Sequence, residues 1–203
     1  MFRDPNVHAL SLVYFLLLGA RYTMVFWLPT LIQSWGVKDL LMIGIYAAIP
    51  NAVGVVGMIL IGRNSDKLHE RRWHFAACVA IAAIGLGITT LLQGNLAGSI
   101  VALSFAVIGV AAATPLFFTL ITEYLSVAAA AAGIALISSL GKLGPAVSPS
   151  INGLIIQYTG SNAYSMYLVM AMYVLAGLIL LVTVRAAKAS ERSPALGGTA
   201  GRA

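Results

Sequence analysis

Two basic side chains lie inside long apolar runs, where a charge is costly. Arg21 is near the middle of the run over residues 8–32, and Lys142 lies in the glycine- and proline-rich run over residues 126–157. A cation at the centre of a bilayer costs at least about 2.5 to 3.5 kcal/mol on insertion scales, so it usually faces a polar cavity or a partner. Both residues are therefore candidates for binding an anionic substrate, and a guanidinium suits a carboxylate especially well. The alternative is that either side chain reaches the membrane interface or pairs with a backbone carbonyl.

Two asparagines follow prolines within apolar runs. Asn51 comes directly after Pro50, and Asn152 comes shortly after Pro149. Irregular backbone at membrane depth is tolerated only against protein or a cavity. We therefore predict that Asn51 and Asn152 line a substrate pathway. The alternative is an interhelical hydrogen bond, which contributes about 0.6 kcal/mol.

Carboxylates are missing from the apolar runs. The six acidic residues fall in connections, at helix ends or in the tail: Asp4, Asp39, Asp66, Glu70, Glu123 and Glu191. A proton-coupled carrier commonly uses an acid within the membrane as its relay, and only Glu123 could be drawn inward to serve. The histidines are scattered, there is one cysteine, and no nucleophile elbow or phosphate-binding loop occurs. We expect no enzymatic activity and no metal or other cofactor.

The composition indicates which elements must position these residues. Of 203 residues, 60% are hydrophobic and 9% are charged, whereas about a quarter are charged in soluble domains. A bilayer core about 30 Å thick needs roughly 20 apolar residues per helix. The sequence therefore predicts an all-α membrane protein with six transmembrane helices. The expected spans are residues 8–32, 40–61, 73–92, 99–121, 126–157 and 164–184, followed by a disordered cytoplasmic tail over residues 185–203.

Two of these spans need comment. The run over residues 126–157 is longer than one bilayer crossing, so we expect it to be bent or locally unwound near residues 141–149. The first run has the layout of a signal peptide. Its apolar character resumes after Arg21, however, so the whole segment is long enough to span.

The distribution of Lys and Arg predicts the orientation. Nine of the twelve fall on one side of the expected spans, Lys38 alone falls on the other, and Arg21 and Lys142 fall within spans. An excess of basic residues usually marks cytoplasmic loops. We expect both termini on the cytoplasmic side of the cell membrane. The formal charge of +6 then reflects topology and calls for no nucleic-acid partner.

The densest charged block lies between the second and third expected spans, where we expect a short turn. It contains Gly62, Arg63, Ser65, Asp66, Lys67, Glu70, Arg71, Arg72 and His74. This block resembles the loop between the eighth and ninth helices of major facilitator superfamily transporters, in particular of the anion:cation symporter branch. Residues 26–30 resemble the end of that branch's seventh helix, and residues 139–144 with Pro149 resemble its glycine-rich eleventh helix.

The resemblance implies transport of small organic anions, such as carboxylates or sugar acids, with a co-transported proton or sodium ion. In such transporters two six-helix halves rock about a site near the membrane midplane. This chain looks like the C-terminal half, and its partner would be a missing N-terminal half or another copy. It departs from the family pattern at Lys142, where a small or amide residue is expected. The rival hypothesis is a non-transporting membrane fragment or scaffold that packs against a partner.

The resemblance also implies a gating role for the charged block. Asp66 would engage the positively polarised end of a neighbouring helix in the other half. Basic side chains of the block would pair with nearby acidic groups. The gating residues expected on this basis are Gly62, Arg63, Asp66, Lys67, Glu70, Arg71 and Arg72.

Overall fold

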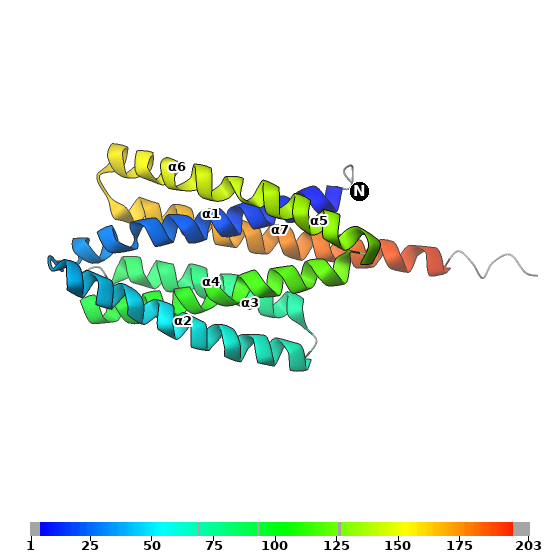
Figure 1. Ribbon diagram of the computed structural model, residues 1–203, viewed down its shortest axis with the longest axis horizontal. Coiled ribbons are helices and arrows are strands. Elements are labelled where there is room, and N and C mark those ends of the chain that lie inside the picture. The colour runs from blue at the N-terminus through cyan, green and yellow to red at the C-terminus, as the bar shows by residue number, and fades with distance from the viewer. Residues whose placement is uncertain (1–4, 69, 93, 126, 197–203) are drawn as a thin grey trace, which may run out of the picture.

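The chain folds as a bundle of long helices (Figure 1). The computed structural model describes residues 5–68, 70–92, 94–125 and 127–196, without the side chains of residues 124, 127–130 and 184–196. The helices are α1 (Pro5–Ser34), α2 (Leu40–Leu68), α3 (Arg71–Leu91), α4 (Leu96–Tyr124), α5 (Val127–Gly141), α6 (Leu143–Thr159) and α7 (Asn162–Leu196).

Six helical segments are long and apolar enough to cross a membrane, which confirms the predicted fold class. They are Pro5–Ser34, Leu40–Leu68, Arg71–Leu91, Leu96–Glu123, Ala131–Thr159 and Asn162–Thr183. The fifth segment consists of α5 and α6, which follow one another end to end (Figure 1). The backbone interruption between them is a single turn residue, Lys142. It lies within residues 141–149, where the length of the run led us to expect a bend.

Two helices, α2 and α7, extend much farther than the others beyond the boundaries expected from hydropathy. The charged block is mostly not a turn, because residues 62–68 continue α2 and residues 71–74 begin α3. Helix α7 continues past the sixth expected span to Leu196, and residues 197–203 of the expected tail lie outside the described part. Residues 185–189 are Arg, Ala, Ala, Lys and Ala, all strong helix formers. Helical order depends on such propensities as well as on the apolar run that sets a membrane span.

Glycines allow α3 and α4 to approach closely. A Cβ on Gly85 would meet the backbone of Ala102 and Ala106, and a Cβ on Gly109 would meet the backbone of Cys78 and Ala82. Small residues at a helix interface let two backbones come together and pack by van der Waals contact. The α3–α4 pair is therefore a tightly packed unit. Helix α2 packs against α4, and α7 packs against α3.

Aromatic rings connect α1 with α4. The ring of Tyr14 stacks on that of Phe117, with centroids 5.2 Å apart and the planes 4° from parallel. Phe118 meets Tyr14 edge-on, with centroids 5.1 Å apart. This contact fixes α1 beside α4 about two turns before Arg21, which places the guanidinium between α1, α2 and α4.

Candidate functional site

A cavity of about 680 Å³ opens between α1, α2 and α4. Small-molecule sites commonly measure about 300–1,000 Å³ and combine apolar walls with a few polar groups. This cavity follows that pattern, because its polar lining side chains are Arg21, Asn51 and Thr114. The apolar lining residues are Met24, Val25, Leu28, Pro29, Ala47, Val55, Met58, Val107, Val110, Ala111 and Pro115.

Arg21 supplies the positive charge of the cavity. Met24, Val25 and Leu28 follow it at helical spacing, so α1 presents one continuous face to the cavity. In the described part of the chain, the ion pairs use Asp66 and Glu123, and neither acid pairs with Arg21. The Arg21 guanidinium is exposed on this face. It can therefore donate its hydrogen bonds to an anionic ligand.

Asn51 lines the same cavity from α2. Its Nδ2 donates to the carbonyl oxygen of Ala47 at 2.8 Å, one turn earlier in the same helix. That bond fixes the amide and leaves Oδ1 as the acceptor. Arg21 and Asn51 together offer charged donors and a neutral acceptor, a combination that suits a hydroxylated carboxylate.

Each of the three helices around the cavity contains a proline. Pro29 lies in α1, Pro50 in α2 and Pro115 in α4. A proline has no backbone N–H, so the carbonyl four residues earlier loses its intrahelical donor. For Pro29 and Pro115 these carbonyls belong to Val25 and Ala111, which both line the cavity. Two residues whose carbonyls lose an intrahelical donor thus line the cavity.

The four predicted substrate-binding residues fall into two groups. Arg21 and Asn51 line the same cavity, whereas Lys142 and Asn152 do not. Lys142 is exposed at the break between α5 and α6, and Asn152 is fully buried. Thr114 also lines the cavity, although the sequence did not single it out as a binding residue. Its signal was a polar side chain next to Pro115 within an apolar run.

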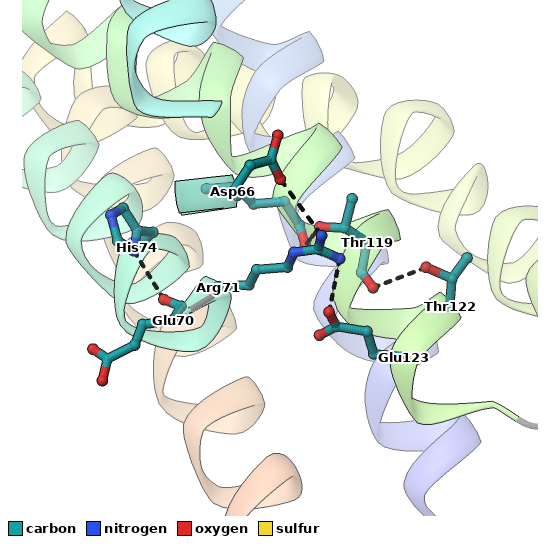
Figure 2. A network of polar contacts seen from close by, with 8 residues as sticks. Asp66, Glu70, Arg71, His74, Thr119, Thr122 and Glu123 are labelled. Atoms are coloured by element: carbon teal, nitrogen blue, oxygen red, sulfur yellow. Dashed lines mark hydrogen bonds and ion pairs between the residues drawn. The ribbon is translucent and has the colours of Figure 1, made fainter. Parts of the chain in front are cut away.

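The charged block forms a polar network at one end of the bundle (Figure 2). Arg71 at the start of α3 contacts two carboxylates, with Nη2 3.4 Å from Oδ1 of Asp66 and Nη1 2.8 Å from Oε1 of Glu123. These contacts join α2, α3 and α4. Glu123 was missing from the predicted gating set because it lies just past the apolar run of the fourth expected span.

His74 connects the start of α3 to the end of α2. Its Nδ1 is 2.8 Å from the carbonyl oxygen of Glu70, and its Nε2 is 3.2 Å from Nδ2 of Asn64. A proton on Nδ1 satisfies both contacts, since Nδ1 then donates to the carbonyl and Nε2 accepts from the amide. The Glu70 carboxylate itself points away from Arg71 (Figure 2).

The other predicted gating residues lie around this network. Arg63 and Lys67 are exposed on the last turns of α2. The Arg72 guanidinium carbon lies 5.4 Å from the ring centroid of Trp73, within the range of a cation–π interaction. Gly62 has open space around it. Among the residues expected from the resemblance, Asp66 and Arg71 form an ion pair with each other.

Six membrane-length helices define this chain as a multi-pass integral membrane protein. The profile of the Major Facilitator Superfamily matches residues 10–201. The chain therefore belongs to the major facilitator superfamily, a family of membrane transporters.

Named relatives support the same family. The chain is 38% identical to "Putative tartrate transporter" of Agrobacterium vitis, over 91% of this chain and 42% of that protein. It is 36% identical to "Putative metabolite transport protein NicT" of Pseudomonas putida, over 89% of this chain and 40% of that protein. It is 34% identical to "Inner membrane transport protein RhmT" of Escherichia coli, over 88% and 41% respectively. The chain thus spans about two-fifths of the length of the curated relatives it matches.

Proposed function

We propose that this chain is the C-terminal six-helix half of a secondary transporter that carries small organic anions across the cell membrane by alternating access. The observation that supports the proposal is Arg21, a cation at membrane depth on the wall of a cavity of about 680 Å³. In this proposal Arg21 binds the substrate carboxylate and Asn51 accepts a hydrogen bond from a substrate hydroxyl. The relative named for tartrate, a hydroxylated dicarboxylate, supports this substrate class.

The proposed second half would cover surface that this chain leaves bare. In the most apolar stretches of the second and fifth spans, 22% and 28% of residues are buried inside the bundle, against 44% or more in the other four. These spans are α2 and α5–α6, which lie toward opposite edges of the bundle (Figure 1). Their exposed apolar residues include Val55, Val56, Ile151 and Leu154. A second six-helix half, either an N-terminal half or another copy, would pack there.

The proposal also includes the orientation of the chain, the coupling ion and two further residues of the substrate pathway. Both termini are on the cytoplasmic side, as the Lys and Arg distribution predicts. A proton or sodium ion is co-transported. No carboxylate among the described residues lines the cavity, so a coupling acid would come from the second half. Lys142 and Asn152 remain proposed contributors to the substrate pathway of the assembled transporter, with weaker support than Arg21 and Asn51.

Uptake into liposomes tests the proposal. The purified chain, alone and together with a six-helix N-terminal half encoded upstream, is reconstituted and supplied with labelled tartrate. We expect uptake when both halves are present, and a decrease of about tenfold or more with Arg21→Ala, because a hydrogen bond to a charged group contributes about 1.5–3 kcal/mol. Membrane insertion of the variant is measured in parallel as the control.

The outcomes separate the hypotheses. Uptake by the chain alone would support pairing of two copies. If uptake is unchanged in Arg21→Ala, the anion-binding role of this residue is wrong. If neither preparation transports any organic acid while both insert normally, a membrane scaffold that packs against a partner is the better explanation.

A further inference from the structure

Among the described residues with buried polar side-chain atoms that lack a hydrogen-bond partner, three lie on α1, α6 and α7. Thr23, Asn152 and Tyr173 are 0%, 0% and 1% exposed. The atoms concerned are Oγ1 of Thr23, Nδ2 and Oδ1 of Asn152, and the hydroxyl of Tyr173. Each buried polar group left unsatisfied costs about 1–3 kcal/mol. Such groups in a stable bundle call for a ligand that satisfies them.

Several other buried hydroxyls in this protein make a hydrogen bond within their own helix. Ser11, Thr89 and Ser104 each donate to the carbonyl four residues earlier at 2.8 Å. Thr23 does not make the equivalent bond to Gly19, although both residues lie in the same regular helix. Its hydroxyl is therefore free to bond to a group outside α1.

Close contacts between α1 and α6 bring Thr23 and Asn152 to the same level of the bundle. A Cβ on Gly144 would meet the backbone of α1, and a Cβ on Gly19 would meet Ser148. Farther along, Gly153 faces the ring of Trp27, so the two helices run in parallel. Thr23 lies one turn beyond Gly19, and Asn152 lies one turn beyond Ser148. The two polar side chains thus follow neighbouring contact points on the facing helices.

Helix α7 brings Tyr173 to the same junction. Met172 faces Gly19, and Val169 lines a cavity together with Thr23. Residue numbers therefore decrease along α7 in the direction in which they increase along α1, so the two helices are antiparallel. Side chains in a helix lean toward its N-terminus, and the long Tyr173 side chain extends toward the level of Val169. That direction leads to Thr23.

The junction borders a space that can hold water. A cavity of about 30 Å³ lies on one side of Thr23, and its lining residues come from α1, α3, α4 and α7, Ser165 among them. A bound water needs only about 10–15 Å³ by this measure and typically makes about three hydrogen bonds. In addition, Pro149 leaves the carbonyl of Pro145, seven residues before Asn152, without its intrahelical donor. A water can both donate and accept here, whereas a metal cation would leave the Asn152 amide donor unsatisfied.

We propose that Thr23, Asn152 and Tyr173 bind one or more internal waters that join α1, α6 and α7. This hydration site is distinct from the cavity between α1, α2 and α4, and it does not depend on the transport proposal. Its waters supply the hydrogen bonds that hold the α6 segment, broken from α5 at Lys142, against the rest of the bundle.

Hydroxyl-radical labelling tests the proposal, because radicals generated from bound water modify the side chains beside it. The purified chain is irradiated, and modification is quantified by mass spectrometry and corrected for the intrinsic reactivity of each side chain. Phe117, which is 0% exposed and packed among aromatic rings, is the internal reference. We expect Tyr173 to be modified several-fold more than Phe117. Equal modification of the two residues would overturn the proposal.

Two variants assign the labelling to this site. Asn152→Leu and Thr23→Val should each lower modification of Tyr173 toward the level of Phe117, while Thr89→Val, which removes a hydroxyl bonded within its own helix, should leave it unchanged. Thr23→Val decides the question if Asn152→Leu fails to fold. Unchanged labelling in a folded Thr23→Val chain would contradict the proposal. If the melting temperature depends on sodium in the wild type and not in Thr23→Val, the site binds a cation and not water.

Discussion

The Arg71 side chain lies against Glu123, with Nη1 2.8 Å from Oε1. Arg71 begins α3 and Glu123 lies near the end of α4, while a short turn joins the other ends of these two helices. The ion pair therefore closes the α3–α4 hairpin at its open end (Figure 2). Asp66 adds the end of α2 to the same guanidinium.

The strength of this ion pair can be measured by a double-mutant cycle with Arg71→Ala and Glu123→Ala. The two side chains are 24% and 57% exposed, and partly exposed pairs contribute about 0.2–1 kcal/mol. We expect a coupling energy within that range, which decreases as salt is added. Unfolding of the detergent-solubilised chain by denaturant is the measurement. Glu70→Ala is the matched control, because its carboxylate points away from Arg71 (Figure 2). A coupling energy of zero would show that the pair does not hold the hairpin closed.

The close approach of α3 and α4 predicts a large effect from one added methyl group. Gly109→Ala places a Cβ against the carbonyl oxygen of Cys78 and the nitrogen of Ala82. Overpacking of this kind typically costs about 1–3 kcal/mol, so we expect a clearly lower melting temperature in detergent. Gly44→Ala is the control, because nothing lies near its added Cβ. Equal melting of the two variants would refute close packing at Gly109.

Accessibility of the α1–α2–α4 cavity can be tested with single cysteines. Asn51→Cys and Thr114→Cys should react with an anionic thiol reagent, because both positions line the cavity beside Arg21. Thr89→Cys should not react, since residue 89 is fully buried. The native Cys78 is buried as well and adds little background. Reaction rates are followed by mass spectrometry. Slow reaction at residues 51 and 114 would mean that the cavity is closed in the membrane.

We expect Arg21 and Lys142 to affect the Kd for substrate to different degrees. Arg21 lines the cavity and Lys142 does not. We expect Arg21→Ala to raise the Kd for tartrate about tenfold or more, in line with the loss of a charged hydrogen bond. Lys142→Ala should raise it by a smaller factor, because Lys142 lies outside this cavity. Binding to the reconstituted transporter is measured by isothermal titration calorimetry. An equal loss in both variants would restore the prediction, made from the sequence, that both cations bind the anion.

The sequence predicted those features that depend on position along one chain. Six apolar runs sufficed for the six spans, and the cost of a buried charge placed Arg21 at a cavity. The resemblance of the charged block correctly indicated the superfamily. It also singled out Asp66 and Arg71, which pair in the structure.

Features that depend on contacts between helices could not be predicted in the same way. Glu123 pairs with Arg71, and Thr114 joins Arg21, only because α4 packs beside both α3 and α1. Asn152 looked like a cavity residue because Pro149 precedes it, but its direction depends on the packing of α6 against α1. Hydropathy also placed the end of α2 too early, since a polar segment can remain helical outside the apolar run.

The prolines of α1, α2 and α4 have a mechanical consequence. At Pro29, Pro50 and Pro115 each helix lacks one backbone hydrogen bond, and all three gaps lie at the level of the cavity. A helix kinks most readily at a proline. The wall that contacts a ligand is therefore also the level at which these three helices bend with least resistance. A ligand held between Arg21 and Asn51 would contact α1 and α2 close to the prolines at which these helices bend.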